Sequence, residues 1–329
     1  MSLTISAAQV DALIANPSSF GSYSSSGPII ITGAITFTQA NNLNAVDATY
    51  IQATISETTV TNLGSIAVNN STRASLNKFS VVVSDTSATA AELNAVQALT
   101  SVAADFTNVA AIEASSASAI TTLYSASTAT TSGLGAETIS VNDSTIVSTT
   151  LNTIDGYTTA AVTTTATTIS GPIADTETAL GSAGIVHAAD IAVTVTDTTV
   201  DAANINDVAQ VLTTGVVAVS SSATSLSGTA AEVNTAITAA RTSDGTNALT
   251  PTITGILALN ATLDDPDTTG TQTTAVADFH AIVDIVGYTG KVTATITEGG
   301  ATALAHATTG LGNTGTGHSL TVTVTDASA

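Results

Sequence analysis

Short runs of alternating hydrophobic and polar residues recur along most of the chain, and each run leads through a turn into an Ala-rich segment. The central example is VVVSDTSATAAELNAVQAL, from Val81 to Leu99. It opens with a strand-like apolar run, passes through an Asp-Thr turn and ends in a segment with a Leu-Asn pair. Alternation with a period of two is typical of half-buried β-strands. The pattern therefore predicts many short strands separated by turns and by Ala-rich helical turns or corners.

The same pattern returns twice at a fixed internal spacing. In three copies an Asp and an Asn lie nine residues apart: Asp85 and Asn94, Asp143 and Asn152, and Asp197 and Asn206. The equivalent Asp residues are 58 and then 54 residues apart, and a looser variant with SG-x-x-A lies at 170–174 and at 227–231. The period of about 55 residues thus divides into half-units of about 27, which is typical of a repeat array.

A half-unit of this size cannot bury its own apolar face, whereas stacked copies can, with their strands aligned in parallel ladders. We therefore expect a mainly β fold: a β-solenoid of about nine irregular coils with short helical corners, plus a small C-terminal β-rich module. The predicted divisions are an N-terminal cap (1–28), a repeat solenoid (29–262) and a C-terminal cap or assembly module (263–329). In this last part, helix-like spacing over residues 276–286 precedes two strands, KVTATITE and HSLTVTVTD, which we expect to form a hairpin.

Asn recurs after Leu, Ile or Val at 44, 77, 94, 152, 206, 234 and 260. We expect each side-chain amide to bond the backbone of the next coil, because a polar amide at an inward corner must be satisfied. The recurring Asp residues leave two alternatives open: they form turns by bonding their own backbone, or they form a column of carboxylates that binds calcium. The candidate calcium ligands are Asp85, Asp143, Asp197, Asp264, Asp265 and Asp267.

The charge balance narrows the possible partners. Four basic residues face 25 acidic ones, giving a net charge of −21, which excludes nucleic acid because its binding needs a basic surface. No apolar stretch is long enough for a membrane span. The first residues lack the features of a secretory signal peptide. We therefore expect an extracellular or cell-surface protein that is exported without an N-terminal signal.

No catalytic motif stands out. The four His residues, at 187, 280, 306 and 318, lack metal-ligand spacing and are expected to serve packing or surface roles. There is no Walker loop and no GxSxG, and the paired carboxylates at 264 and 265 lie in a loop without an apolar pocket signal. Thr at every second position fits an exposed sheet face. We expect no enzymatic activity; a polysaccharide lyase would need clustered acids, bases and Arg, and the chain has two Arg.

Several segments resemble the Ala/Thr/Ser-rich repeats of large bacterial cell-surface proteins, including cyanobacterial ones. They are VSDTSATAAELNAVQAL, VTVTDTTVDAANINDVAQVL, DGYTT at 155–159 and TSLSGTAAEVNTAI. The resemblance covers residues 80–245 well and 29–80 loosely. It implies an adhesin, a surface-layer (S-layer) protein or an extracellular fibre, with export of the type I secretion kind. The calcium-binding nonapeptide GGxGxDxUx of type I substrates is absent, so the resemblance does not imply calcium.

Together these features predict an extracellular structural protein that self-assembles, as a homo-oligomer or polymer, into a filament or surface layer. Strand edges and solenoid ends would make the contacts, since unpaired edges of strands recruit further strands. The alternative is an adhesin or carbohydrate-binding stalk module that acts as a monomer, with cell-surface polysaccharide as its partner.

Overall fold

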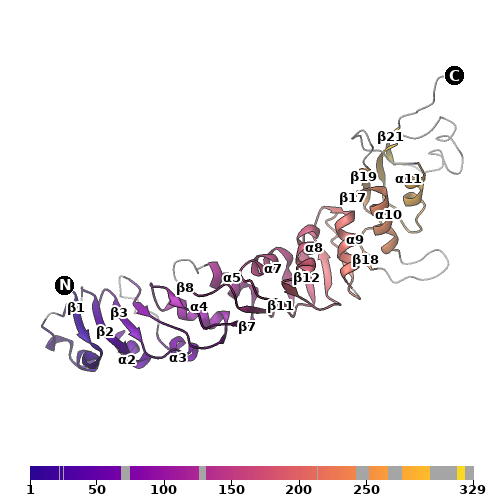
Figure 1. The fold of residues 1–329 in the computed structure, drawn as a ribbon. Coiled ribbons are helices and arrows are strands. Elements are labelled where there is room, and N and C mark those ends of the chain that lie inside the picture. Colours follow the sequence, from indigo (N-terminus) through magenta and orange to yellow (C-terminus); the bar gives the residue numbers. More distant parts are fainter. Residues whose placement is uncertain are drawn as a thin grey trace, which may run out of the picture. The chain divides into compact units, whose positions relative to one another are not determined.

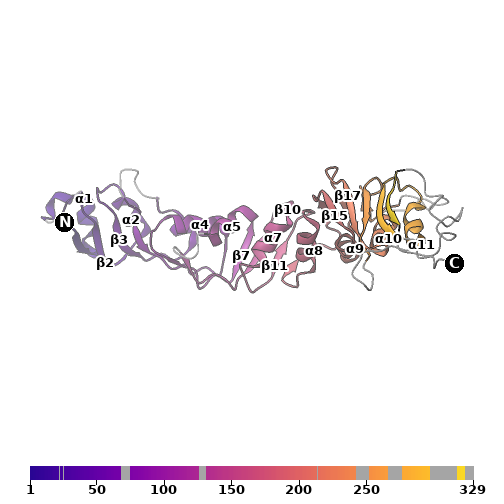
Figure 2. The ribbon, with the colours of Figure 1, turned by 90° about the horizontal axis from the view of Figure 1, so that it is seen from above.

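The computed structural model describes residues 1–21, 23–24, 26–67, 75–125, 131–212, 214–241, 252–265, 276–296 and 317–322. The chain divides into two compact units. Strands and helices alternate in both of them (Figures 1 and 2). The first comprises Met1–Asp143 and Thr153–Thr165, and the second comprises Ser144–Asn152 and Ala166–Ala329. Among the described residues, no helix has the length and apolar character needed to cross a membrane.

The first compact unit alternates strands and helices. One sheet has the order β1-β2-β3-β4, with each strand parallel to its neighbour. A second sheet includes β5, β7, β9 and β11 in sequence order, also parallel, and β6 pairs with β8. The strands are β1 (Leu3–Ser6), β2 (Ile29–Ile35), β3 (Ile51–Ile55), β4 (Lys78–Ser80), β5 (Ser87–Thr89), β6 (Ala104–Asp105), β7 (Ala111–Ser115), β8 (Thr131–Ser132), β9 (Thr138–Val141) and β11 (Val162–Thr164). The helices are α1 (Val10–Ala15), α2 (Phe37–Leu43), α3 (Val60–Gly64), α4 (Ala90–Ala98) and α5 (Ala117–Ser125), with short 3-10 turns at Ala7–Gln9 and Pro17–Ser19.

The second compact unit continues the alternation with two five-stranded parallel sheets, of order β10-β12-β14-β16-β18 and β15-β17-β19-β20-β21. Its strands are β10 (Thr145–Val147), β12 (Thr168–Gly171), β13 (Ile185–Val186), β14 (Ala192–Val195), β15 (Thr199–Asp201), β16 (Val217–Val219), β17 (Ser225–Gly228), β18 (Ile253–Thr254), β19 (Asn260–Leu263), β20 (Val292–Ile296) and β21 (Ser319–Val322). Its helices are α8 (Ile173–Gly181), α9 (Ala202–Val211), α10 (Ala230–Ala239) and α11 (Val276–Val283), and α7 (Ser148–Asp155) begins in it. Helices of successive repeats pack side by side, α8 on α9, α9 on α10 and α10 on α11 (Figure 1).

We predict strands from the alternation of apolar and polar residues, and the burial of side chains along the strands alternates in the same way. In β12, Ile169 is fully buried while Thr168 and Ser170 face outward and are half-buried. In-register neighbours share a face, so Ile169 lies between Ile146 and Val193, which are also buried. Each repeat thus adds a layer of β-branched side chains to a narrow core.

The mainly β expectation is wrong. The described residues form an α/β arrangement of parallel strands and regular helices, not a β-solenoid with short helical corners. The reason lies in the Ala-rich segments, because Ala has the highest helix propensity. Thr89 and Glu92 form a capping box at the start of α4, and Thr229 and Glu232 form another at α10. The sequence T-A-A-E, which is the signature of such a box, therefore begins a helix of two to three turns where we expected a corner.

The C-terminal hairpin is also wrong. The helix predicted from the spacing over 276–286 is present as α11, but β20 pairs in parallel with β19 and β21 in parallel with β20. The two strands therefore extend the sheet that starts at β15. Residues 297–316, which connect them, lie outside the described residues but are long enough for a parallel crossover. At the other end of the chain, β1 of the predicted N-terminal cap pairs in register with β2 of the predicted solenoid. The division into three domains stays a prediction.

Candidate functional site

The recurring Asn residues link each repeat to the next one, as the sequence predicted. In four helices the Asn is the fifth residue, and its Nδ2 donates to a backbone carbonyl of the following helix. The pairs are Asn94 with Ala119 O, Asn152 with Asp175 O and Asn206 with Glu232 O, each at 2.9 Å, and Asn234 with Ala281 O at 3.0 Å. In the first three pairs the acceptor is the third residue of the next helix, so the geometry is the same each time.

The other three recurring Asn residues also bond neighbouring repeats. Asn44 Nδ2 donates to Ala67 O at 2.9 Å. The buried Asn77 accepts the Ile51 N–H at 2.9 Å through Oδ1, and Asn260 Oδ1 accepts the Lys291 N–H at 3.1 Å. Six of the seven amides therefore bond the backbone of the following repeat as predicted, whereas Asn77 bonds that of the preceding repeat.

The recurring Asp residues link in the opposite direction. Each carboxylate accepts the N–H of the first residue of the helix in the preceding repeat, whereas the turn alternative left open by the sequence was a bond to its own backbone. The bonds are Val60 N to Asp85 at 2.7 Å, Ala117 N to Asp143 at 2.6 Å, Ile173 N to Asp197 at 2.7 Å and Ala230 N to Asp265 at 3.0 Å. A carboxylate at this place satisfies a free helix N–H and interacts favourably with the helix dipole. Sequence reasoning missed this role because the partner lies 24–35 residues upstream.

The nine-residue spacing follows from these two contacts. In the third copy, Asp197 bonds back to α8 and Asn206, at the fifth position of α9, bonds forward to α10. In the second copy, Asp143 bonds back to α5 within the first compact unit, and Asn152 bonds forward to α8 within the second. One copy of the repeat therefore carries both linking residues. The Asp lies before a short strand, and the Asn lies after the first turn of the helix that follows this strand.

The looser variant ends a strand with Gly two residues before its helix begins, at Gly171 before α8 and Gly228 before α10. Gly171, with a φ of 155°, ends the strand beside β10, and a Cβ there would overlap the Ser148 hydroxyl at the start of α7. Gly228, with a φ of 151°, likewise faces Ala202 at the start of α9. The positive φ and the close approach explain the Gly of the recurring SG dipeptide.

Most of the candidate calcium ligands are dispersed along the chain. Asp85, Asp143 and Asp197 each serve a different helix, and among the described residues no group of three His, Cys, Asp or Glu side chains is arranged to hold a metal ion. Asp264 and Asp265 follow β19, while Asp267 lies outside the described residues. Burial raises the pKa of Asp264, and the nearby carboxylates of Glu232, Asp265 and Asp201 raise it further. Calcium binding stays a prediction.

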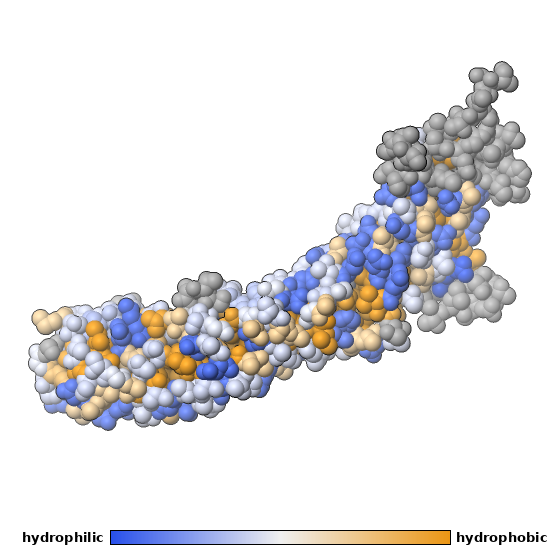
Figure 3. Space-filling view, viewed as in Figure 1, coloured by the Kyte–Doolittle hydropathy of each residue, from blue (hydrophilic) through white to orange (hydrophobic). Residues whose placement is uncertain are grey.

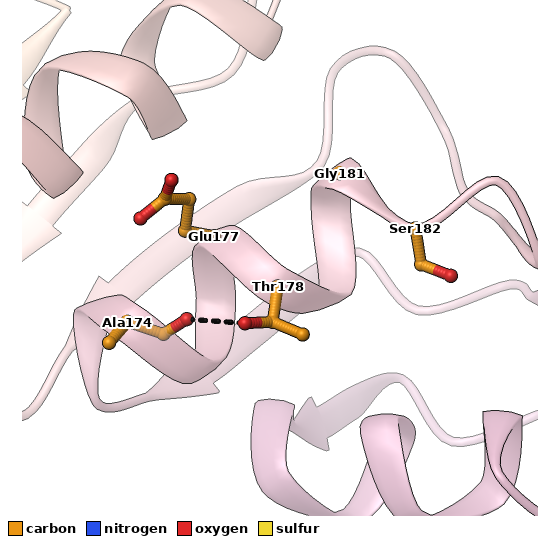
Figure 4. Close-up of a pocket in the computed structure, with 5 residues that line it drawn as sticks. All are labelled: Ala174, Glu177, Thr178, Gly181 and Ser182. Carbon is orange, nitrogen blue, oxygen red and sulfur yellow. Dashed lines mark hydrogen bonds between the residues drawn. The ribbon is translucent and has the colours of Figure 1, made fainter.

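Two surface hollows differ in whether their polar groups converge on a ligand. The hollow along α8, of about 570 Å³, is lined by residues of one helix and its end (Figure 4). There the Thr178 hydroxyl donates to the Ala174 carbonyl at 2.9 Å within the helix, and Glu177 extends from another side of it. These groups do not converge on a common point.

The second hollow, of about 390 Å³, lies beside stacked Tyr124 and Tyr157 rings, whose centroids are 4.6 Å apart. The buried Tyr124 hydroxyl has no hydrogen-bond partner among the described residues. Gly133 and Gly156 also line this hollow. An aromatic pair beside an unsatisfied hydroxyl suits a small polar ligand.

The described His residues have packing and backbone contacts. His318 Nδ1 accepts the Val292 N–H at 2.9 Å, and its ring packs edge-on against Phe279 at 5.3 Å. His280 Nδ1 lies 3.5 Å from Asp284 Oδ2, four residues later and just after the end of α11. His187 contacts Ala188 O at 2.9 Å, and His306 lies outside the described residues.

The first and last described strands each present a free edge. β1 pairs with β2, β21 pairs with β20, and each is the terminal strand of its sheet in the described part of the chain. Leu3 donates its N–H to Pro28 O at 3.0 Å, on the β2 side. Successive residues of a strand direct their N–H groups to opposite sides, so the N–H of the exposed Thr4 points to the open edge.

On the face seen in Figure 3, apolar and polar residues are interspersed over both compact units.

Comparisons with protein-family models, with curated proteins and with solved structures find no match to this chain.

Proposed function

We propose that this chain is an extracellular structural protein that self-assembles into a filament or surface layer through its end strands. One observation carries the proposal: β1 and β21, the first and last described strands, are end strands of two parallel sheets, and each has one strand partner and one open edge among the described residues. A parallel sheet with an open edge accepts a further parallel strand, which is a common mode of strand addition.

Contact between the two different edges leads to a polymer. β21 of one copy meeting β1 of the next is a heterologous contact, because the two surfaces differ. Such contacts repeat without limit unless the rotation between copies closes a ring. The proposal therefore predicts open filaments, which associate side by side where a layer forms.

The charge distribution supports contact at these places. The chain carries a net charge of −21, so two copies repel each other over most of their surfaces. β1 and β21 contain no ionisable side chain, and Asp11 is the one acidic residue among the first 46. The acidic composition and the resemblance of residues 80–245 to bacterial cell-surface repeats support the extracellular location.

The test blocks the open edge of β1. Thr4→Pro removes the N–H that points to this edge and keeps the extended backbone that proline favours. Thr4→Val is the matched control, because it keeps the N–H and suits a strand. We expect the wild type and Thr4→Val to form polymers in light scattering and negative-stain electron microscopy, and Thr4→Pro to stay monomeric with unchanged circular dichroism. A monomeric wild type at all concentrations, or polymers of Thr4→Pro equal to those of the wild type, would refute the proposal.

The alternative, an adhesin or carbohydrate-binding module, is supported by the hollow beside Tyr124 and Tyr157. Tyr157 stacks on the buried Tyr124 and is itself half-buried and accessible from the surface, and Tyr rings with a polar hydroxyl are frequent at binding interfaces. Under this alternative the wild type is a monomer that binds oligosaccharides in a glycan-array screen. Tyr157→Ala abolishes that binding, whereas Tyr50→Ala, away from the hollow, leaves it unchanged.

A further inference from the structure

We propose that copies of this chain associate side by side through the outer face of the β10-β12-β14-β16-β18 sheet. This inference rests on the proposed function and names the surface that joins filaments laterally. The face is defined by one row of in-register residues, one from each strand: Val147, Ser170, Thr194, Ala218 and Thr254.

The row points away from the core. The alternate row on the same strands, which includes Ile146, Ile169, Val193 and Val217, is at most 2% exposed. Val147 is 46% exposed, and the other four residues of the outer row are half-buried. These side chains are small, so the outer surface of the sheet is low in relief and suits close approach of a second flat surface.

The absence of charge identifies a second copy as the occupant. The described strands of this sheet contain no charged residue. The other large sheets each carry one, namely Lys78 in β4, Glu113 in β7 and Asp201 in β15. A basic partner would be attracted to the acidic remainder of this chain of net charge −21, whereas an equally acidic copy is repelled there. Two copies can therefore meet closely where neither presents a charge.

The area of this face determines at which stage of assembly it can hold two copies together. Five strands about 4.8 Å apart, with about three residues each, cover roughly 200–250 Å². A stable dimer usually buries about 800 Å² on each partner, so one face is too small to hold two monomers together. In a filament the same face recurs with every copy, and the contacts add as in other multivalent systems. Lateral association should therefore appear only after filaments have formed.

The first test places a charge at the centre of the face. Thr194→Lys is compared with Thr262→Lys, which adds the same charge to the exposed outer side of β19 in the neighbouring sheet. Electron microscopy is expected to show bundles or layers for the wild type and Thr262→Lys, and single filaments of normal length for Thr194→Lys. The light scattering of Thr194→Lys should be at least about five-fold lower at equal polymer mass.

The second test uses the absence of Cys from the chain. A single Thr194→Cys or Thr262→Cys variant is assembled and treated with a short bis-maleimide. Covalent dimers are expected for Thr194→Cys and not for Thr262→Cys. Two results would overturn the lateral contact and leave end-to-end assembly standing: bundling of Thr194→Lys equal to the wild type, or single filaments of the wild type together with no cross-linking of the Thr194→Cys variant. A wild type that forms no polymer would refute the proposed function itself.

Discussion

The contact between Asp197 and α8 provides a quantitative test of the links between repeats. Asp197 accepts the Ile173 N–H at 2.7 Å, and the residue before this helix, Pro172, makes no side-chain cap. Asp197→Ala therefore leaves the N–H of the buried first residue of α8 without its carboxylate partner. Loss of a cap costs about 0.5–2 kcal/mol, and loss of the charge at the helix N-terminus costs about 0.3–1 kcal/mol.

Together these losses predict that Asp197→Ala lowers the free energy of unfolding by roughly 1–3 kcal/mol. For a unit of this size that corresponds to a fall in Tm of about 2–4 °C per kcal/mol. Asp197→Asn keeps an oxygen acceptor, so it should lose only about 0.3–1 kcal/mol. Asp190→Ala, at an exposed site before β14, is the control for loss of one negative charge.

The assay is urea unfolding followed by circular dichroism, together with hydrogen exchange of the first turn of α8. We expect faster exchange of the Ile173 amide in Asp197→Ala than in the wild type, with little change in Asp190→Ala. If Asp197→Ala and Asp190→Ala have the same stability and the same exchange at α8, the carboxylate does not link the two repeats and the reasoning is refuted.

Four further predictions follow from single contacts. Gly171→Ala should destabilise the fold by about 1–3 kcal/mol through overpacking at a positive φ. Its control, Gly181→Ala, has open space for the added methyl group and should be neutral or slightly stabilising. Chemical denaturation measures the stability of both variants. Asn206→Ala should cost about 0.5–1.5 kcal/mol as one hydrogen bond between helices is lost, measured by the same method. Burial raises the pKa of Tyr288 to about 12. The difference in 295 nm absorbance between the wild type and Tyr288→Phe should therefore titrate near that pH. The neutral Tyr288 side chain stabilises the fold fully below pH ~10, and this contribution is lost as the pH rises through the folded-state pKa. The raised pKa of Asp264 means that its ionised form destabilises the fold above that pKa and the penalty disappears as the pH falls, so Asp264→Asn should raise Tm slightly at pH 7 and not at low pH; no gain at pH 7 would contradict this.

The repeat spacing and the alternation of apolar residues were sufficient to predict stacked repeats, parallel strands and the structural role of the Asn residues. Local pattern was misleading for the Ala-rich segments, since Leu93 and Val96 suit either a corner or a buried helix face. The capping box of Thr89 and Glu92 was the signal that distinguishes them.

The function of the Asp residues could not be derived from local sequence. A turn Asp before Ser or Thr has the same sequence pattern whether it bonds its own turn, binds a cation or caps a helix about 25 residues upstream. The choice depends on strand register, which places Asp197 directly beyond the strand that pairs with β12, the strand preceding α8. The parallel direction of β20 and β21 likewise depends on the pairing of β20 with β19 and of β21 with β20, which lies outside the local sequence pattern.

Negative-stain electron microscopy of the wild-type chain over a range of concentrations, with calcium and with excess chelator, tests the central claim most directly. Filaments or layers that grow with concentration are the predicted result, and their persistence in chelator would assign assembly to strand contacts without calcium. Isolated monomers at every concentration in both conditions would contradict the account and favour the adhesin alternative.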